Sequence, residues 1–203
     1  MTFSELPINK KAYIFDLDNV LFPVKDYDLQ VYYLFATFLE YQEAFPPASD
    51  LLQFMKKVYE NHGPDRIFEK AKEVYAFDEK YRENFERLFR EAKLPLKLLL
   101  YHNVLSLLQD LVVDRKQLFI FTAGDPHTQL NKIKQTEWHG LEQFLRVYFS
   151  DENVTETRSS FLSRILIENG LSHKDVMIFG SNTKGQDFAS ELRIDYLPIS
   201  NFI

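Results

Sequence analysis

Five short apolar runs constrain the fold most, because helical stretches separate most of them. The runs are rich in β-branched and aromatic residues and cover 12–15, 118–121, 146–149, 176–179 and 194–198. The helical stretches lie near 101–112, 129–136, 160–169 and 186–192. This alternation is typical of βαβ units, in which a parallel sheet has helices on both faces. The sequence therefore predicts an α/β fold with a doubly wound, Rossmann-like parallel sheet.

A second pattern fills residues 27–94, where apolar residues recur at helical spacing without a strand signal. The pattern breaks near 45–50, 62–65 and 94–95, and Ser49 or Asp50 is the expected N-cap of the second helix. We expect four short helices inserted after the first strand. Residues 1–22 and 96–203 are then the α/β core, and 23–95 form a helical domain.

Polar residues follow the first four apolar runs. In open α/β sheets ligands bind outside the carboxyl ends of the strands, so these residues mark the expected site. They are Asp16-Leu17-Asp18, Thr122-Ala123-Gly124-Asp125, Ser150-Asp151-Glu152, and the segment from Gly180 to Asp187.

Asp16 and Asp18 form the most informative of these sets. Residues two apart in an extended segment point the same way, so the two carboxylates share one small volume and repel each other. A divalent cation, a bound phosphate with its own metal, or a shared proton makes such a pair tolerable. The alternative is an Asx-rich surface turn, which the apolar residues on both sides argue against.

Composition excludes several function classes. The net charge of -6 argues against nucleic acid and anionic membranes as partners, while a small phosphorylated molecule remains compatible. The absence of cysteine excludes disulfides, thiol catalysis and cysteine-based metal sites. No apolar run resembles a secretory signal or a membrane span, so we expect a soluble cytoplasmic protein.

Over nearly its whole length the chain resembles the haloacid dehalogenase-like (HAD) superfamily of phosphohydrolases. Residues 16–22 (DLDNVLF) resemble the first motif of that family, and 119–122 (FIFT) resemble the second. The helical block stands where the C1 cap of subfamily I is inserted. Residues 121–125, with Gln129 and Lys132, also resemble a segment common in HAD hydrolases of this cap type.

The resemblance implies a role for each matching residue. Asp16 is the nucleophile that forms an aspartyl-phosphate, and Asp18 is first the general acid and then the general base. Mg²⁺ is bound by the Asp16 carboxylate and the Asp18 backbone carbonyl. Thr122 hydrogen-bonds the phosphoryl group together with backbone N–H groups around Ala123 and Gly124. Because the metal-free dehalogenases lack an acid at the position of Asp18, a phosphatase is favoured.

The third motif of the family normally supplies a lysine. Between residues 150 and 161 Arg158 is the only cation. Arginine binds phosphate as a planar fork rather than as a point charge, and the alternative for Arg158 is a solvated residue near a helix start. Lys132, Lys134 and Lys184 are weaker substitutes by position.

The fourth motif normally places an aspartate directly after a glycine, but here Ser181 follows Gly180. A hydroxyl is a weaker ligand for Mg²⁺ than a carboxylate. Asp187, acting through water, or Asp151 can compensate. The alternative for Asp187 is a first-turn residue at a helix N-terminus.

Two functions from different classes follow. One is a Mg²⁺-dependent phosphatase that acts on a small phosphorylated metabolite. The other is a catalytically impaired relative that keeps the phosphate pocket as a binding or regulatory module. A receiver-like phosphoacceptor fits less well because of the long helical insertion. Substrate identity and oligomeric state are left open.

Overall fold

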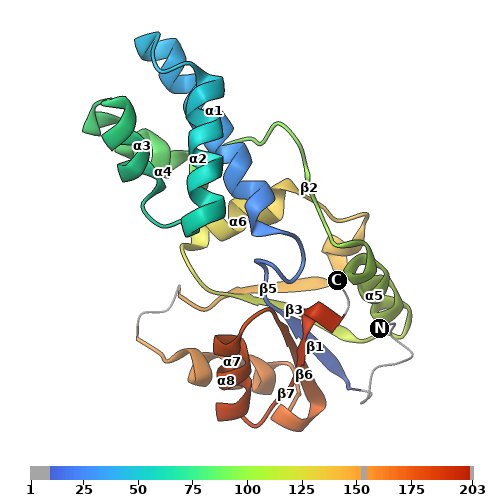
Figure 1. Ribbon diagram of the computed structural model, residues 1–203. Coiled ribbons are helices and arrows are strands. Elements are labelled where there is room, and N and C mark those ends of the chain that lie inside the picture. The colour runs from blue at the N-terminus through green and yellow to red at the C-terminus, as the bar shows by residue number, and fades with distance from the viewer. Residues whose placement is uncertain (1–9, 152–154, 202–203) are drawn as a thin grey trace. The chain divides into compact units, whose positions relative to one another are not determined.

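The computed structural model describes residues 10–151 and 155–201, so Glu152 lies outside the described residues. The chain divides into two compact units. We call the first the α/β unit; it comprises Met1–Pro23, Leu99–Gln129 and Thr136–Ile203. We call the second the helical unit; it comprises Val24–Leu98 and Leu130–Gln135. Figure 1 shows the elements of both units.

The α/β unit is built on five parallel strands. They are β1 (Ala12–Phe15), β3 (Gln117–Thr122), β5 (Leu145–Phe149), β6 (Val176–Gly180) and β7 (Asp195–Pro198). Their order is β5-β3-β1-β6-β7, and each neighbouring pair is parallel. All five predicted strands are confirmed, with bounds that differ by at most one residue at either end.

Helices cover both faces of this sheet, and the predicted doubly wound fold is confirmed (Figure 1). The helices of this part of the chain are α5 (His102–Val113), α6 (Pro126–Gln135), α7 (Arg158–Glu168) and α8 (Thr183–Glu191). On one face, Ile14 of β1 shares an apolar cluster with Leu162 of α7 and Ala189 of α8. Helix α5 contacts β3. The alternate residues Tyr13 and Phe15 point to the other face of the sheet.

Several short elements were not predicted. The strands β2 (Leu98–Leu99) and β4 (Thr136–Glu137) form a separate two-stranded sheet. The 3-10 turns η2 to η5 cover Glu79–Tyr81, Leu141–Phe144, His173–Asp175 and Ile199–Asn201. Two-residue strands and single 3-10 turns are too short to show a hydrophobic period, which is why the sequence pattern does not indicate them.

Strand β1 lies where the strand order reverses. The chain places β3 and then β5 on one side of β1, and afterwards β6 and β7 on the other side. Phe15 at the end of β1 is in register with Ile120 of β3 and Phe179 of β6. Because the three strands are parallel, the residues that follow them reach the same edge. Ligands of such sheets bind at this switch point.

The helical unit contains α1 (Val24–Glu43), α2 (Ala48–His62), α3 (Ile67–Tyr75) and α4 (Arg82–Glu91). The four predicted helices are present, although α1 has 20 residues and is not short. The predicted N-cap of α2 is wrong. Its N-cap is Pro47, whose carbonyl accepts from the N–H groups of Asp50 and Leu51, so Ser49 and Asp50 lie inside the first turn.

Aromatic side chains fill the core of the helical unit. Phe35 contacts Phe85 and Phe68 with ring centroids 5.0 and 5.9 Å apart, and Phe68 meets Phe77 edge-on at 5.3 Å. These geometries stabilise the packing beyond the area that they bury. No helix in the described part of the chain combines the length and hydropathy that crossing a bilayer requires.

Helix α6 belongs to both units. The buried Asn131 side chain donates to the Ala92 carbonyl at 3.0 Å and to the Tyr27 hydroxyl at 3.1 Å. These bonds help explain why residues 130–135 group with the helical unit, whereas the sequence pattern assigned them to the α/β core.

The loop after β6 is held by a close contact between Gly180 and Tyr196. A Cβ built on Gly180 lies 2.8 Å from both Cε2 and Oη of Tyr196. The Tyr196 hydroxyl donates to the Asn182 carbonyl at 3.0 Å. Only glycine permits this approach, and the contact fixes the segment that carries Ser181.

We predict that Gly180→Ala lowers the free energy of unfolding by about 1–3 kcal/mol, because its methyl group overlaps the Tyr196 ring. Denaturant unfolding monitored by circular dichroism measures the change. Gly185→Ala is the matched control, since its Cβ lies at an ordinary 3.5 Å from the same ring. In a Tyr196→Ala background Gly180→Ala should change the free energy of unfolding little. An equal loss of unfolding free energy in both backgrounds would exclude the Tyr196 contact as the cause of the destabilisation.

Candidate active site

Asp16 lies immediately after β1, in the middle of the sheet edge. Its N–H donates to the Phe179 carbonyl at 3.2 Å, which continues the pairing of β1 with β6. Its carboxylate accepts from the Leu17 N–H at 2.7 Å and from the Thr122 hydroxyl. Thr122, at the end of β3, is 1% exposed. The structure thus brings Asp16 and Thr122 together, as the sequence predicts.

The Asp16 carboxylate is electrostatically unfavourable where it lies. Burial raises its pKa, and the Asp18 charge acts in the same direction. The Leu17 N–H, the Arg158 guanidinium and the Thr122 hydroxyl lower the pKa but do not cancel the rise. The repulsion predicted for the two aspartates is therefore present.

A tight turn carries Asp18. The Leu21 N–H donates to the Leu17 carbonyl at 3.1 Å, and the Asn19 N–H donates to the Phe22 carbonyl at 2.9 Å. Asn19 has a φ of 58°, a left-handed conformation that asparagine tolerates better than most residues. The turn keeps the Asp18 carboxylate at the strand end and close enough to Asp16 to raise its pKa.

Gln129 connects these groups, and the sequence assigned it no role. Its side chain is 5% exposed and donates through Nε2 to Thr122 Oγ1 at 3.0 Å and to Asp18 Oδ2 at 3.3 Å. Asp125 begins α6 by accepting from the Thr128 N–H at 2.7 Å, and this start places Gln129 one turn into the helix. A buried glutamine next to two candidate site residues is a signal that only the fold reveals.

Arg158 is half-buried and lies close enough to Asp16 for its charge to lower the pKa of that carboxyl. Its guanidinium stacks 4.5 Å from the Phe188 ring centroid and 5.3 Å from that of Phe121. Its Nε is buried and has no hydrogen-bond partner. Thr157 caps α7 and accepts from the Ser160 N–H at 3.2 Å, so Arg158 is the first residue of that helix. Arg158 therefore does stand at a helix start, as the alternative expected, but it is half-buried and its guanidinium packs against aromatic rings instead of being fully solvated.

Asp16 and Arg158 line one small cavity of about 20 Å³, roughly the space of one water molecule. Ser181 lines it too. The complete lining is Ile14, Asp16, Phe121, Arg158, Ile178, Phe179, Gly180, Ser181, Asn182, Gly185 and Phe188. All of these residues belong to the α/β unit. Residues that end β1, start α7 and follow β6 thus meet at the switch point.

The loop predicted to bind phosphate is partly engaged already. The Gly124 N–H donates to Asp151 Oδ2 at 2.8 Å, and the Ala123 carbonyl accepts from Gln129 at 2.7 Å. Asp151 also accepts from the Ser150 hydroxyl at 2.8 Å. A phosphate bound by the Gly124 N–H must therefore displace Asp151, and one bound by the Thr122 hydroxyl must replace that hydroxyl's bond to Asp16.

The donors that can hold a cation are few. Within residues 10–151 and 155–201 no three His, Asp or Glu side chains gather closely enough to bind a metal ion. Asp187 is exposed and absent from the cavity lining. It is the fifth residue of α8, and Asn182 caps this helix, so the interpretation of Asp187 as a first-turn residue is wrong.

The donors that remain, on Asp16, Asp18 and Ser181, nevertheless fit Mg²⁺. This ion is commonly held by one or two carboxylates, several waters and substrate phosphate. The Asp16 carboxylate, whose raised pKa a cation would lower, is one donor, the Asp18 backbone carbonyl is the second that the family resemblance implies, and Ser181 adds a neutral hydroxyl. Such a site binds the metal more weakly than one with a carboxylate in place of Ser181.

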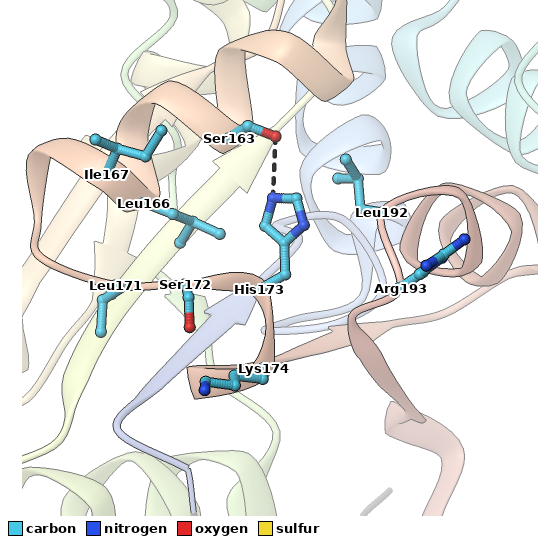
Figure 2. Close-up of a pocket in the computed structure, with 9 residues that line it drawn as sticks. All are labelled: Ser163, Leu166, Ile167, Leu171, Ser172, His173, Lys174, Leu192 and Arg193. Carbon is cyan, nitrogen blue, oxygen red and sulfur yellow. Dashed lines mark hydrogen bonds between the residues drawn. The ribbon is translucent and has the colours of Figure 1, made fainter.

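A larger cavity of about 570 Å³ lies near the start of β6 (Figure 2). Because the strands are parallel, it lies at the opposite edge from Asp16. Ser163 Oγ lies 3.0 Å from His173 Nε2 but donates its one proton to the Ser159 carbonyl. The imidazole is then the donor to Ser163, so this pair does not form an activated nucleophile.

Comparisons with known proteins agree with this geometry. The family model for haloacid dehalogenase-like hydrolases matches residues 13–199. The chain therefore belongs to this hydrolase family, as the sequence motifs predicted. No curated protein matches at a significant level.

Solved structures share the fold. A putative β-phosphoglucomutase from Thermotoga maritima has a TM-score of 0.59 and 20% identity, over 91% of this chain and 82% of its own. A family IA HAD hydrolase from Entamoeba histolytica has a TM-score of 0.57 and 17% identity, over 93% and 83%. A putative phosphoglycolate phosphatase from Lactobacillus plantarum has a TM-score of 0.55 and 13% identity, over 95% and 87%.

We predict that Asp16→Asn stabilises the metal-free protein at neutral pH. Since the pKa of Asp16 is raised in the folded state, the unfolded state ionises first as pH rises, and the wild type loses stability that the asparagine variant keeps. Thermal unfolding with a chelator should give a higher Tm for the variant at pH 7. The difference should shrink as pH falls below the ordinary aspartate range, and a difference independent of pH would contradict this cause.

Proposed function

We propose that this protein is a Mg²⁺-dependent phosphomonoester hydrolase that acts on a small phosphorylated metabolite through an aspartyl-phosphate at Asp16. The arrangement of Asp16, Asp18 and Thr122 at the switch point carries the proposal. Two of the three similar structures described above are those of a putative phosphoglycolate phosphatase and a putative β-phosphoglucomutase, which supports phosphoryl chemistry on this fold. The helical unit is proposed to be the cap that gives substrate specificity.

In the first step an Asp16 oxygen attacks phosphorus while the bond to the leaving oxygen breaks. The protonated Asp18 carboxyl gives its proton to that leaving oxygen. The Thr122 hydroxyl, which donates to Asp16 in the free protein, is placed to bind a phosphoryl oxygen. The Arg158 Nε, buried without a partner, offers a donor to the same anion.

In the second step Asp18, now a carboxylate, removes a proton from water. The water oxygen attacks the phosphorus of the aspartyl-phosphate, and the Asp16 carboxylate is regenerated as inorganic phosphate leaves. The Asp16 carboxylate and the Asp18 carbonyl, with Ser181 nearby, would hold Mg²⁺, which would neutralise phosphate charge.

The direct test is phosphate release from an aryl phosphate and a panel of phosphorylated metabolites, with Mg²⁺ or with a chelator. We expect Mg²⁺-dependent turnover that Asp16→Asn lowers by about 10³-fold or more, because the nucleophile is lost. Circular dichroism checks that the variant is folded. Turnover that persists in Asp16→Asn would exclude the aspartyl-phosphate route.

A phosphate-binding module without turnover is the second candidate, and Ser181 favours it because Mg²⁺ prefers a carboxylate. We predict that Ser181→Asp lowers the Mg²⁺ concentration for half-maximal activity by at least roughly tenfold. Mg²⁺ titration of turnover measures this, and calorimetry measures binding if turnover is absent. Thr183→Asp is the control for added charge in the same exposed segment. An equal effect of both variants would show that Ser181 does not hold the metal.

A further inference from the structure

The Gln129 amide faces three acceptors. From the first part of α6, its Nε2 lies 2.7 Å from the Ala123 carbonyl, 3.0 Å from Thr122 Oγ1 and 3.3 Å from Asp18 Oδ2. The side chain is 5% exposed, and its Oε1 is buried with no hydrogen-bond partner. A buried glutamine that leaves its own acceptor unused in order to present its donors is costly to stability.

The chemistry of its neighbours fixes the orientation of this amide. The Ala123 carbonyl can only accept, in every protonation state of Asp18. Turning the amide over would place Oε1 against that carbonyl and add repulsion. The NH₂ group therefore faces Ala123, and its two protons are shared among the Ala123 carbonyl, Thr122 Oγ1 and Asp18 Oδ2.

The same bond orders the Thr122 hydroxyl. That hydroxyl has one proton. Because Gln129 donates to its oxygen, the Thr122 proton is free to point at Asp16, to which Thr122 donates. One amide therefore orients groups beside both aspartates.

We propose that Gln129 is a positioning residue that selects which oxygen of Asp18 carries the catalytic proton. The assignment rests on the proposed phosphatase function. Asp18 Oδ2 accepts from Nε2, so in the protonated acid the proton sits on Oδ1. Oδ1 then gives that proton to the leaving oxygen as the bond from phosphorus breaks, and later takes a proton from the attacking water.

This role has a signature that lost packing does not have. A poor leaving group needs the proton from Asp18 to depart, whereas a good one departs largely without it. Gln129→Met keeps the side-chain size and removes the donor. It should lower kcat/KM by about ten- to hundredfold for 4-methoxyphenyl phosphate and by less than about threefold for 4-nitrophenyl phosphate.

The ratio of the two kcat/KM values is the readout, because this parameter reports only the steps up to aspartyl-phosphate formation. Gln143→Met is the matched control. Gln143 also donates to a carbonyl, that of Gly140, but it is exposed and precedes β5, at the edge of the sheet opposite the site. Gln129→Asn, whose amide is one methylene shorter, is the second variant should Gln129→Met fail to fold.

Three results would overturn the assignment. An equal loss of kcat/KM for both substrates, which leaves their ratio unchanged, points to a structural role, and wild-type kcat/KM values for both substrates in both variants exclude any role. The leaving-group effect must also disappear in an Asp18→Ala background, so its persistence there shows that Gln129 does not act through Asp18. A wild type without Asp16-dependent turnover instead refutes the proposed function, and this assignment with it.

Discussion

The burial of one carboxylate at the switch point of the sheet is the constraint on which the rest of the site depends. Asp16 follows the central strand, so its charge has β3 and β6 beside it and little access to water. Burial of a charge is tolerated only where donors or cations surround it. Three groups from different segments stabilise the Asp16 charge: the Leu17 N–H, the Thr122 hydroxyl and the Arg158 guanidinium. The pKa of Asp16 stays raised, so the compensation is incomplete and the site is suited to bind a further cation.

Hydrogen bonding near the aspartate pair is incomplete as well. Gln129 Oε1 and Arg158 Nε are buried side-chain atoms without a partner in the described part of the chain, and both belong to residues that contact or neighbour the aspartate pair. One is an acceptor and the other a donor. Native proteins rarely leave such atoms unsatisfied away from functional sites. Both atoms lie near the aspartate pair, so a ligand that completes their hydrogen bonding must present an acceptor, such as an anion's oxygen, to Arg158 Nε and a donor to Gln129 Oε1.

The sheet and the aspartate pair could be predicted because they depend on local pattern. Short β-branched runs mark the strands, and the parallel order then places Asp16 and Thr122 at one edge. The place of Arg158 could not be predicted, since it depends on where Thr157 starts α7 and on aromatic rings contributed by β3 and α8. The family resemblance includes Gln129 but gives it no role, because only the fold shows that its side chain lies beside Thr122 and Asp18. Asp187 was assigned to a first turn because the helical pattern starts at 186, whereas Asn182 caps α8 earlier.

Arg158 and Ser181 are best understood together. A site with a carboxylate at position 181 has three acids near the metal: Asp16, Asp18 and that carboxylate. In such a site the positive charge of the lysine or arginine side chain only balances the charge of the phosphate. Here the pair Asp16 and Asp18 faces one fixed guanidinium, which lowers the pKa of Asp16 from within the same cavity. Arginine stays charged at every physiological pH. A serine at position 181 leaves the site with one negative charge fewer than an acid would. The Arg158 guanidinium therefore neutralises a larger share of the remaining charge, and less negative charge remains to attract a metal ion. Arg158 is half-buried and lines the same cavity as Asp16 and Ser181, so its fixed positive charge is available to an anion bound there with or without a metal.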